Sequence, residues 1–159
     1  MTQSIDHDGG GRMNPGLRAV RGAYAALARG DLAMFTAQFD DHVEWHHPHG
    51  FGEPFGGTHL GSVAIVQSVF APRCENWAAV THAPLSFLHG SDHGSDHVLA
   101  LGRTRFVGFG GTSGTAEFAH VWLLDEHRIV GVRVFEDTAI AAAHKGTPGG
   151  AGTGGVAPR

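Results

Sequence analysis

The chain has 159 residues, a formal net charge of −4 and one cysteine. This length is typical of one domain with a hydrophobic core, and an acidic balance without a basic run argues against a nucleic-acid partner. No apolar stretch is long enough to span a membrane, the N-terminus does not resemble a signal peptide, and a lone cysteine excludes an internal disulfide framework, so a cytoplasmic location is predicted.

Both ends of the chain carry too few apolar residues to pack into a core. Residues 1–14 are polar and Gly-rich, and residues 145–159 are rich in Gly, Pro and Thr. Both segments are therefore predicted to be disordered, which leaves residues 15–144 as the domain.

Two helices are predicted at the start of the domain. Pro15 suits the first turn of a helix, apolar residues then recur at helical spacing, and Gly30 is a good C-terminal cap. Asp31 caps a second, short helix that includes Phe39 and ends at residues 40–41.

The middle of the chain alternates between strand and loop patterns. A short strand over residues 42–47 is followed by the glycine-rich residues 49–57, which are predicted to form a mobile loop able to close over a pocket. Ser62 is expected to cap a third helix. Residues 77–88 and 98–107 read as two strands, and the sequence HGSDHGSDH between them is predicted to be a hairpin loop.

The dominant element is a hairpin over residues 115–137, with its turn at residues 125–127. Phe118, His120 and Trp122 alternate onto one face of its first strand. Both faces are largely apolar, so the hairpin is expected to be covered on both sides. A polar group on such a surface needs a reason, and we expect His120 to face a ligand cavity.

After this hairpin the pattern favours one more short helix in the sequence TAIAAAH. Helices are thus grouped ahead of an antiparallel sheet. This order predicts an α+β domain rather than an alternating α/β one.

Four stretches in this order resemble a known family: YAALARGDL, DDHVEWHHP, the helix GTHLGSVAIVQSVF and the closing AHVWLLDEHRIVGVRVFED. They resemble the nuclear-transport-factor-two-like superfamily, and more closely its SnoaL-like polyketide cyclase and ketosteroid isomerase branch, over residues 17–138. The resemblance implies a cone-shaped, curved antiparallel sheet wrapped around about three N-terminal helices, with an internal apolar pocket. It also implies a homodimer that pairs through the outer face of the sheet.

The resemblance can be carried over to single positions. The general-base aspartate of ketosteroid isomerases falls on His47, just before Pro48, and their protonated oxyanion aspartate falls on His120. The position of their tyrosine donor reads Ala23, with Tyr24 one residue along and facing elsewhere. The isomerase constellation is therefore not retained, and a steroid isomerase is not expected.

His47 and His120 are instead the predicted catalytic pair of a looser, cyclase-type site. An apolar pocket keeps imidazoles neutral, so they can act as a base or as hydrogen-bond donors to a developing enolate. The predicted substrate-binding residues, which hold the molecule by shape, are Tyr24, Trp45, Phe118, Trp122, Val132 and Val134. The predicted function is a cofactor-independent cyclase or isomerase acting on a hydrophobic, polyketide-like small molecule of bacterial secondary metabolism.

Two alternatives stay open. Epoxide hydrolases of the limonene type belong to the same family, but their last-strand aspartate corresponds to Val134, and no acid accompanies Arg103 and Arg105. Glu44 or Glu136 facing inward would restore that alternative. The other alternative is a non-catalytic ligand-binding or dimeric accessory domain, in which His120 is a core histidine bonded to a neighbour.

A metal site is not predicted, although histidines cluster at residues 46–49 and recur every fourth residue over 89–97. Spacing by four aligns ligands only on a helix, and the second segment is too glycine-rich to form one. Cys74 has no histidine partner in the sequence and is expected to be an inert thiol.

Overall fold

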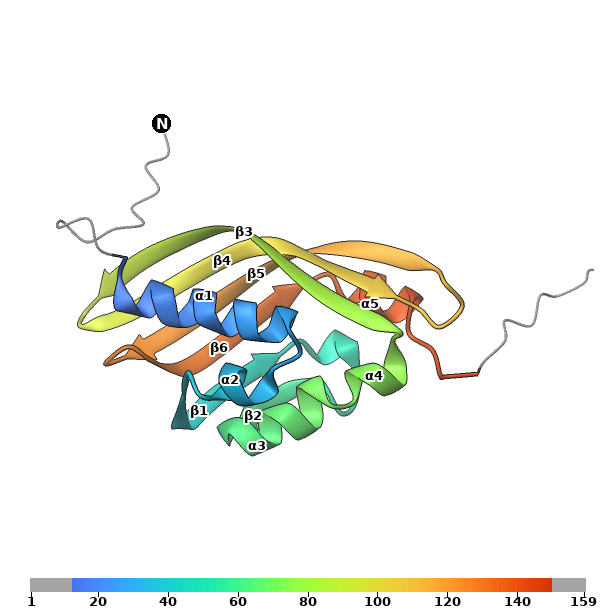
Figure 1. Ribbon diagram of the computed structural model, residues 1–159, viewed down its shortest axis with the longest axis horizontal. Coiled ribbons are helices and arrows are strands. Elements are labelled where there is room, and N and C mark those ends of the chain that lie inside the picture. The colour runs from blue at the N-terminus through green and yellow to red at the C-terminus, as the bar shows by residue number, and fades with distance from the viewer. Residues whose placement is uncertain (1–12, 150–159) are drawn as a thin grey trace, which may run out of the picture.

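Six strands form one curved sheet in the order β2-β1-β6-β5-β4-β3 (Figure 1). The structure is a computed structural model that describes residues 13–149. The strands are β1 (Phe39–His47), β2 (Gly57–Leu60), β3 (Ala79–Asp92), β4 (Ser95–Val107), β5 (Ser113–Asp125) and β6 (Arg128–Glu136). Every neighbouring pair is antiparallel except β1 and β6, which run parallel. The predicted α+β fold with a curved sheet is confirmed.

Helices cover one face of this sheet. They are α1 (Pro15–Ala28), α2 (Leu32–Thr36), α3 (Gly61–Ile65), a π-helical turn η2 (Val66–Phe70), α4 (Arg73–Asn76) and α5 (Thr138–Ala143), with a short 3-10 turn η1 (His49–Phe51). Figure 1 shows α1 lying along the long strands, with α2, α3 and α4 on the same side. None of the helices within residues 13–149 is long and apolar enough to cross a membrane.

The α1 helix begins where the sequence predicts. The Asn14 side chain accepts hydrogen bonds from the backbone N–H groups of Gly16 and Leu17, and Pro15 occupies the first turn. Leu17, Val20 and Ala23 are buried against the sheet. The helix contacts β3, β4 and β6, so it closes the concave side of the domain.

Strand alternation places the main core between α1 and the sheet. Residues paired across antiparallel strands point to the same face, and Ala100, His120 and Val134 are paired in this way across β4, β5 and β6. All three are buried. The strand pattern therefore carries His120 to the covered side, as predicted.

The glycine-rich residues 49–57 are anchored rather than free to close over a pocket, so that prediction is wrong. Phe51 and Phe55 are buried in a second apolar cluster with Trp77, Phe106, Ala116 and Ala141. The Trp77 indole N–H donates to the Ala141 carbonyl at 3.0 Å. The two phenylalanines fix a segment whose glycine content alone indicated mobility.

Two other boundaries also differ from prediction. The sequence HGSDHGSDH is not a loop: β3 and β4 pair as far as Asp92 and Ser95, and only His93 and Gly94 turn, both with positive φ. Residues 39–41 belong to β1 instead of ending the second helix. In the first of these places cross-strand pairing outweighs the weak strand preference of Gly and Asp.

Some smaller expectations are settled by local contacts. The third helix begins at Gly61 with Leu60 at its cap, and Ser62 makes no capping bond. Of the ends predicted to be disordered, residues 1–12 and 150–159 lie outside the described residues. Within the described part, Asn14 caps α1, and the Gly146 N–H bonds to the Asn76 carbonyl at 2.9 Å.

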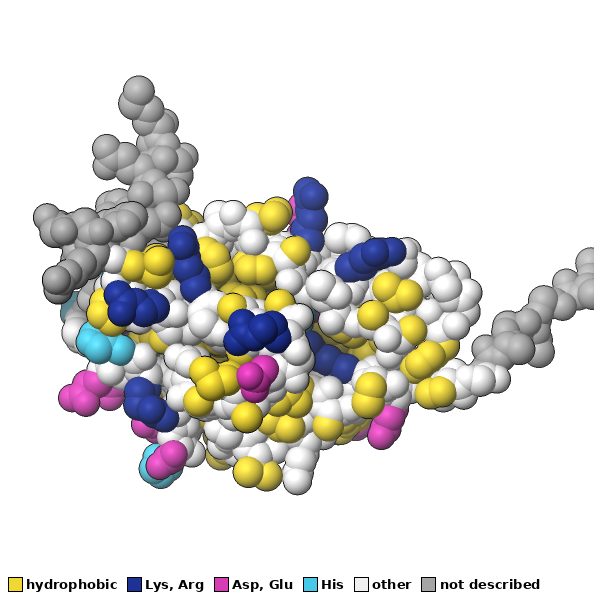
Figure 2. Space-filling model, viewed as in Figure 1, with side chains coloured by type: hydrophobic (Ala, Val, Ile, Leu, Met, Phe, Trp, Pro, Cys, Tyr) yellow, Lys and Arg dark blue, Asp and Glu magenta, His cyan; other side chains and the backbone are white. Residues whose placement is uncertain are grey.

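The outer face of the sheet is not covered by other parts of residues 13–149. Phe135 is 56% exposed, and Leu101 and Leu123 on the neighbouring strands are also exposed. Figure 2 shows the opposite, helical side, where charged and hydrophobic side chains are mixed. The expectation that both faces of the hairpin are covered is therefore not met by the monomer.

Gly102 of β4 allows the sheet to pack closely beneath the site, and this generates a stability prediction. A Cβ there would overlap the Ala83 carbonyl oxygen and lie 2.6 Å from the Phe118 ring. We expect Gly102→Ala to lower the free energy of unfolding by about 1–3 kcal/mol through overpacking. Urea titration followed by tryptophan fluorescence measures the change.

Gly110→Ala is the matched control, because nothing lies within 4 Å of a Cβ at Gly110 and its φ is not positive. We expect its unfolding free energy to change by less than about 0.5 kcal/mol. Equal stabilities for the two variants would contradict the close-packing argument.

Candidate functional site

The helices and the concave face of the sheet enclose a small cavity. Its lining residues come from α1, β1, the η2 to α4 segment, β3, β5 and β6: Tyr24, Leu27, Trp45, His47, Phe70, Arg73, His82, His120, Trp122, Val134 and Glu136. The volume open to the centre of a water-sized sphere is about 10 Å³. This is room for about one water molecule, so a larger ligand enters only when lining side chains move.

Strand register brings the polar groups to this cavity from distant parts of the sequence. His120 on β5 is paired with Val134 on β6, and Phe118 is paired with Glu136. Inward positions therefore continue along β6 from Val134 to Glu136. Trp45 and His47 alternate onto the same side of β1 and are both buried.

A directed chain of hydrogen bonds orients His120. The Trp122 indole N–H donates to the Tyr24 hydroxyl at 3.3 Å, and this hydroxyl lies 2.7 Å from His120 Nδ1. Indole can only donate, so the tyrosine proton has an acceptor only if His120 Nδ1 accepts it. In this arrangement His120 carries its own proton on Nε2.

Tyr24 therefore faces the cavity, and the prediction that it faces elsewhere is wrong. Its side chain lines the cavity, and its ring also lies 5.3 Å from that of Trp122. Ala23 is buried as well. The buried stripe of α1 is wide enough to include consecutive residues, which spacing along the sequence did not reveal.

A second chain of polar contacts starts at Arg73. Its Nη1 lies 2.8 Å from His82 Nε2. Because a guanidinium can only donate, His82 Nε2 accepts and its Nδ1–H donates to Thr104 Oγ1 at 2.9 Å. The Thr104 hydroxyl is then oriented to donate toward Glu136, an interaction that lowers the pKa of this carboxyl group.

Burial sets the protonation states in the cavity. It lowers the pKa of His47 from 6.5 to about 2 and that of His120 from 6.5 to about 3, and the charge of Arg73 adds to both shifts. The pKa of His82 is lowered well below 6.5, again mainly by burial. Burial raises the pKa of Glu136 from 4.5 to about 7. The imidazoles are therefore neutral at pH 7, and Glu136 changes protonation near this pH.

Four buried polar atoms on the cavity wall have no hydrogen-bond partner within residues 13–149. They are Trp45 Nε1, His47 Nδ1, His120 Nε2 and Glu136 Oε1. Unsatisfied buried polar atoms are rare, and each costs about 1–3 kcal/mol. All four belong to residues that line the same cavity, which makes this cavity the candidate site.

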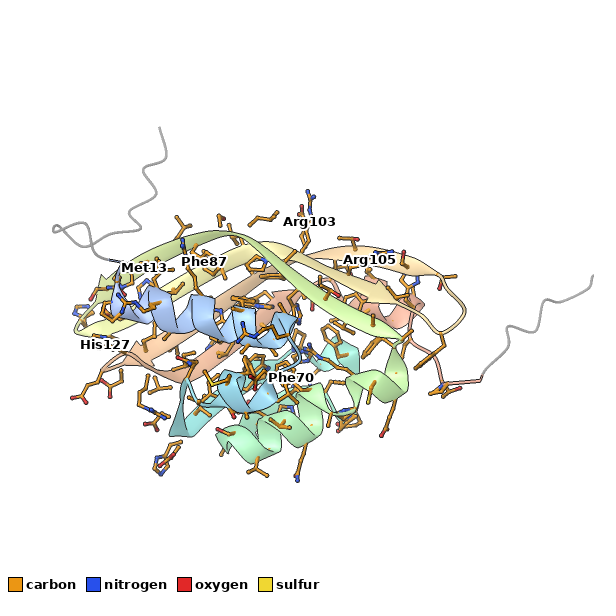
Figure 3. The ribbon with its side chains drawn as sticks, in the orientation of Figure 1. Met13, Phe70, Phe87, Arg103, Arg105 and His127 are labelled. Atoms are coloured by element: carbon orange, nitrogen blue, oxygen red, sulfur yellow. The ribbon has the colours of Figure 1, made fainter. Side chains whose placement is uncertain are left out.

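The sequence-predicted residues divide into three groups. His47 and His120 line the same cavity, together with Tyr24, Trp45, Trp122 and Val134. Phe118 and Val132 are buried but do not line it; Phe118 stacks on His120 with ring centroids 4.0 Å apart. Glu44 is exposed, and so are Arg103 and Arg105, with Arg103 projecting away from the sheet in Figure 3.

Five lining residues are not among the predicted site residues: the apolar Leu27 and Phe70, and the polar Arg73, His82 and Glu136. Glu136 enters the prediction only through the epoxide hydrolase alternative, although it continues the alternation of Val132 and Val134. His82 is half-buried and alternates with exposed positions on β3. Arg73 had no such signal, because it follows the η2 turn, whose geometry cannot be read from the sequence.

The histidine clusters do not converge on a metal site. Within the described part of the chain, no group of three or more His, Cys, Asp or Glu residues is placed to hold a metal ion. Cys74 is exposed, and its thiol donates to the Ala71 carbonyl at 3.1 Å.

The family model of the SnoaL-like domain matches residues 20–132. The chain belongs to this family. An NTF2-like (nuclear-transport-factor-two-like) protein from Burkholderia thailandensis is 32% identical to this SnoaL-like protein, with a TM-score of 0.72, and the match covers 83% of this chain and 98% of that one. A search of curated proteins found no match.

Two other solved structures extend the comparison. TerC, crystallised with polyporic acid, is 25% identical with a TM-score of 0.75, and the match covers 82% of this chain and 98% of TerC. IdmH, a candidate polyketide cyclase from Streptomyces antibioticus, is 15% identical with a TM-score of 0.68 over 82% of this chain and 98% of IdmH. At that identity, the likeness to IdmH shows the fold alone.

The buried histidines predict how stability depends on pH. The pKa values of His47 and His120 are lowered in the fold, so below pH 6.5 the unfolded chain binds protons that the folded chain does not, and stability falls. Glu136 acts in the opposite direction between its ordinary pKa of 4.5 and about 7. Each group changes stability by about 1.4 kcal/mol per pH unit, so two histidines outweigh one glutamate.

We therefore expect the unfolding free energy to fall by at least about 1.4 kcal/mol per unit between pH 6 and pH 5, with His82 adding to the loss. Urea titrations at several pH values measure this slope. His120→Gln should reduce the slope, whereas the exposed control His42→Gln should leave it unchanged. A stability that is constant or rises over this range would contradict the assigned protonation states.

Proposed function

We propose that this SnoaL-like protein is a cofactor-independent cyclase or isomerase that acts on a hydrophobic, polyketide-like small molecule in the cytoplasm. The observation that supports it best is the set of four unpartnered polar atoms on one buried cavity. Two are ring nitrogens of His47 and His120, one is the indole N–H of Trp45, and one is a carboxylate oxygen of Glu136. Donors and a base facing each other across a small space are what proton transfer at carbon requires.

In this proposal, Glu136 is the base. A general base works best when its pKa lies near the working pH, and burial raises the pKa of Glu136 to about 7. The very low pKa values of His47 and His120 make their rings poor proton acceptors. These rings therefore serve as neutral hydrogen-bonding groups.

The chemical step follows from these roles. Glu136 removes a proton from a carbon next to a carbonyl group, and the electron pair of the C–H bond moves toward the carbonyl oxygen. The His120 Nε2–H and the Trp45 indole N–H stabilise the resulting enolate. The carbanion then attacks a second carbonyl carbon of the same molecule, which closes a ring, and the oxygen of that carbonyl receives its π electrons and takes the proton from Glu136. Alternatively, the carbanion regains the proton from Glu136 at another carbon, which isomerises the substrate.

The walls of the cavity contribute shape. Trp45, Phe70 and Trp122 are aromatic, and Leu27 and Val134 fill the space between them. Holding a flexible substrate folded against such walls brings its reacting ends together. The co-crystallisation of TerC, which is 25% identical, with polyporic acid supports the proposal that this protein receives a small organic molecule.

Carbon-acid exchange tests this proposal without the natural substrate. The neutral ketone 2-tetralone has acidic C–H bonds, and its deuterium uptake from D₂O is followed by proton NMR. We expect the protein to accelerate the exchange, with a rate that rises as the pH increases through about 7, because only ionised Glu136 accepts a proton.

Glu136→Gln should lower this rate at least about 100-fold. The matched control is Glu44→Gln, which makes the same change at an exposed position and should keep the full rate. Equal activity of the two variants would show that Glu136 is not the base.

Epoxide hydrolysis remains a second candidate because one observation favours it. This function requires an acidic side chain that faces the cavity. Glu136 lines the cavity, whereas Glu44 is exposed. There, Glu136 would activate water instead of a C–H bond. Glu136-dependent formation of a diol from styrene oxide distinguishes this function.

The non-catalytic alternative, a ligand-binding or accessory domain, predicts that replacing both His47 and His120 leaves ligand affinity nearly intact.

We also propose that the protein forms a homodimer through the outer face of its sheet. Exposed apolar residues on three neighbouring strands, Leu101, Leu123 and Phe135, support this proposal. An exposed apolar surface of this kind is typical of an interface.

A charge placed in that interface should dissociate the dimer. We expect Phe135→Glu to sediment as a monomer at concentrations where the unchanged protein sediments as a dimer. Val63→Glu is the matched control, because Val63 is equally apolar and 70% exposed but lies on α3. A dimer that survives Phe135→Glu, or an unchanged protein that is monomeric, would contradict the proposed interface.

A further inference from the structure

A second, larger pocket lies against the cavity and shares part of its wall. This outer pocket offers a volume of about 250 Å³ to the centre of a water-sized sphere and is lined by Leu27, Ala28, Gly30, Leu32, Phe70, Arg73, Val80, Thr81 and His82. Leu27, Phe70, Arg73 and His82 also line the inner cavity. Figure 2 shows a hollow on this side of the molecule with a basic side chain inside it. Arg73 is the only basic residue of the outer pocket's lining other than His82.

Arg73 is fixed in position by its surroundings. Its Nε donates to the Val69 carbonyl at 3.1 Å, its Nη1 donates to His82 Nε2 at 2.8 Å, and its Cζ lies 4.4 Å from the centre of the Phe70 ring. These contacts hold the plane of the guanidinium at the boundary between the two pockets. They also leave Nη2 without a hydrogen bond among the described residues.

The charge of Arg73 has no carboxylate at ion-pair distance within the described part of the chain. No Asp or Glu oxygen of residues 13–149 forms an ion pair with it within 4.0 Å. Burial lowers its pKa to about 10, so it remains a cation at pH 7. His47, His82 and His120 are neutral, so Glu136 is the group that interacts electrostatically with the positive charge of Arg73 at the boundary.

An unpaired, partly buried cation is costly unless an anion joins it. Glu136 compensates it only in part, since this acid is about half protonated at pH 7. A guanidinium with free N–H donors binds carboxylates and similar planar anions well. The apolar side chains beside it, Leu27 and Phe70, suit the hydrophobic part of the same molecule.

We propose that the substrate is an acidic hydrophobic molecule whose anionic group, a carboxylate or an ionised enol, binds to Arg73 at the boundary of the two pockets. This inference rests on the proposed function. The apolar body of the substrate occupies the outer pocket between Leu27 and Phe70. Its reacting carbonyl segment extends into the inner cavity, where Glu136 and His120 lie. Arg73 is thus a substrate-binding residue that selects for charge.

A pair of probes that differ only in charge tests this inference. 2-Naphthoate and 2-naphthamide have the same ring system and nearly the same shape, and titration calorimetry at pH 7.5 measures their dissociation constants. We expect the protein to bind the naphthoate at least about tenfold more tightly than the amide, a difference typical of a charge-assisted hydrogen bond. Equal binding, tighter binding of the amide, or no binding of either probe would overturn the proposal.

Substitutions show whether Arg73 is the residue that causes the preference for naphthoate over naphthamide. Arg73→Gln should abolish the preference for naphthoate over the amide, and Arg73→Lys should retain part of this preference through its charge. Arg103→Gln removes the same charge from the exposed outer face and is the matched control. A preference that persists in Arg73→Gln, or that disappears equally in Arg103→Gln, would show that Arg73 is not the anion site. The comparison of the two probes on the unchanged protein tests the proposal even if Arg73→Gln fails to fold.

The outcome can be separated from that of the proposed function. Exchange of the neutral 2-tetralone depends on Glu136 and needs no anion. Exchange without anion preference overturns the substrate class and leaves the proton-transfer function in place. Anion preference without exchange supports Arg73 as a binding residue and rejects the proton-transfer function.

Discussion

Burial of ionisable side chains behind the curved sheet is the constraint on which the rest of the site depends. Removal from water keeps the rings of His47 and His120 uncharged and brings the pKa of Glu136 close to neutrality. Arg73 keeps its charge and disfavours protonation of both rings further. An exposed surface would not combine neutral histidine rings, a carboxyl group with a pKa near 7 and a fixed cation. Contact with water would return the pKa of each group toward its ordinary value. Apolar side chains in the same places would form a more stable core, so the sequence accepts a loss of stability in exchange for these chemical properties.

Burial alone would leave the donors without direction, and two chains of hydrogen bonds supply it. The contact from Tyr24 to His120 Nδ1 places the remaining ring proton on Nε2, the atom that has no partner in the protein. The contact from Arg73 to His82 Nε2 fixes the tautomer of the His82 ring in the same manner, and it orients the Thr104 hydroxyl toward Glu136. Each chain begins at a group that can only donate, so its direction cannot reverse. Donors that are already aimed need no reorganisation when charge develops on a substrate.

Strand alternation is what made the sheet half of the site predictable from the sequence. A period of two placed His120 and Trp122 of β5 on the covered face. The same alternation on β6, extended by two residues beyond Val134, includes Glu136. Residues on helices were harder, since the buried stripe of α1 is broad and includes both Ala23 and Tyr24. The loops predicted from glycine content were wrong where tertiary contacts decide the outcome: paired strands extend through HGSDHGSDH, and buried phenylalanines anchor residues 49–57. Arg73 could not be predicted, because its direction depends on the turn that precedes it.

That turn also bears on how a ligand reaches the acid. The η2 segment (Val66–Phe70) is π-helical, and a π turn inserts an extra residue that rotates everything after it. In a regular α-helix, Arg73 would point in a different direction from the one that now places it between the two pockets. Such turns are less favourable than α-helix and are common at functional sites. The inner cavity has room for about one water molecule whereas the outer pocket is far larger, so under the proposed function the boundary formed by Phe70 and Arg73 shifts when a substrate passes. Phe70 ends the π-helical segment and Arg73 begins α4, while His47, His120 and Glu136 stand on the hydrogen-bonded strands β1, β5 and β6.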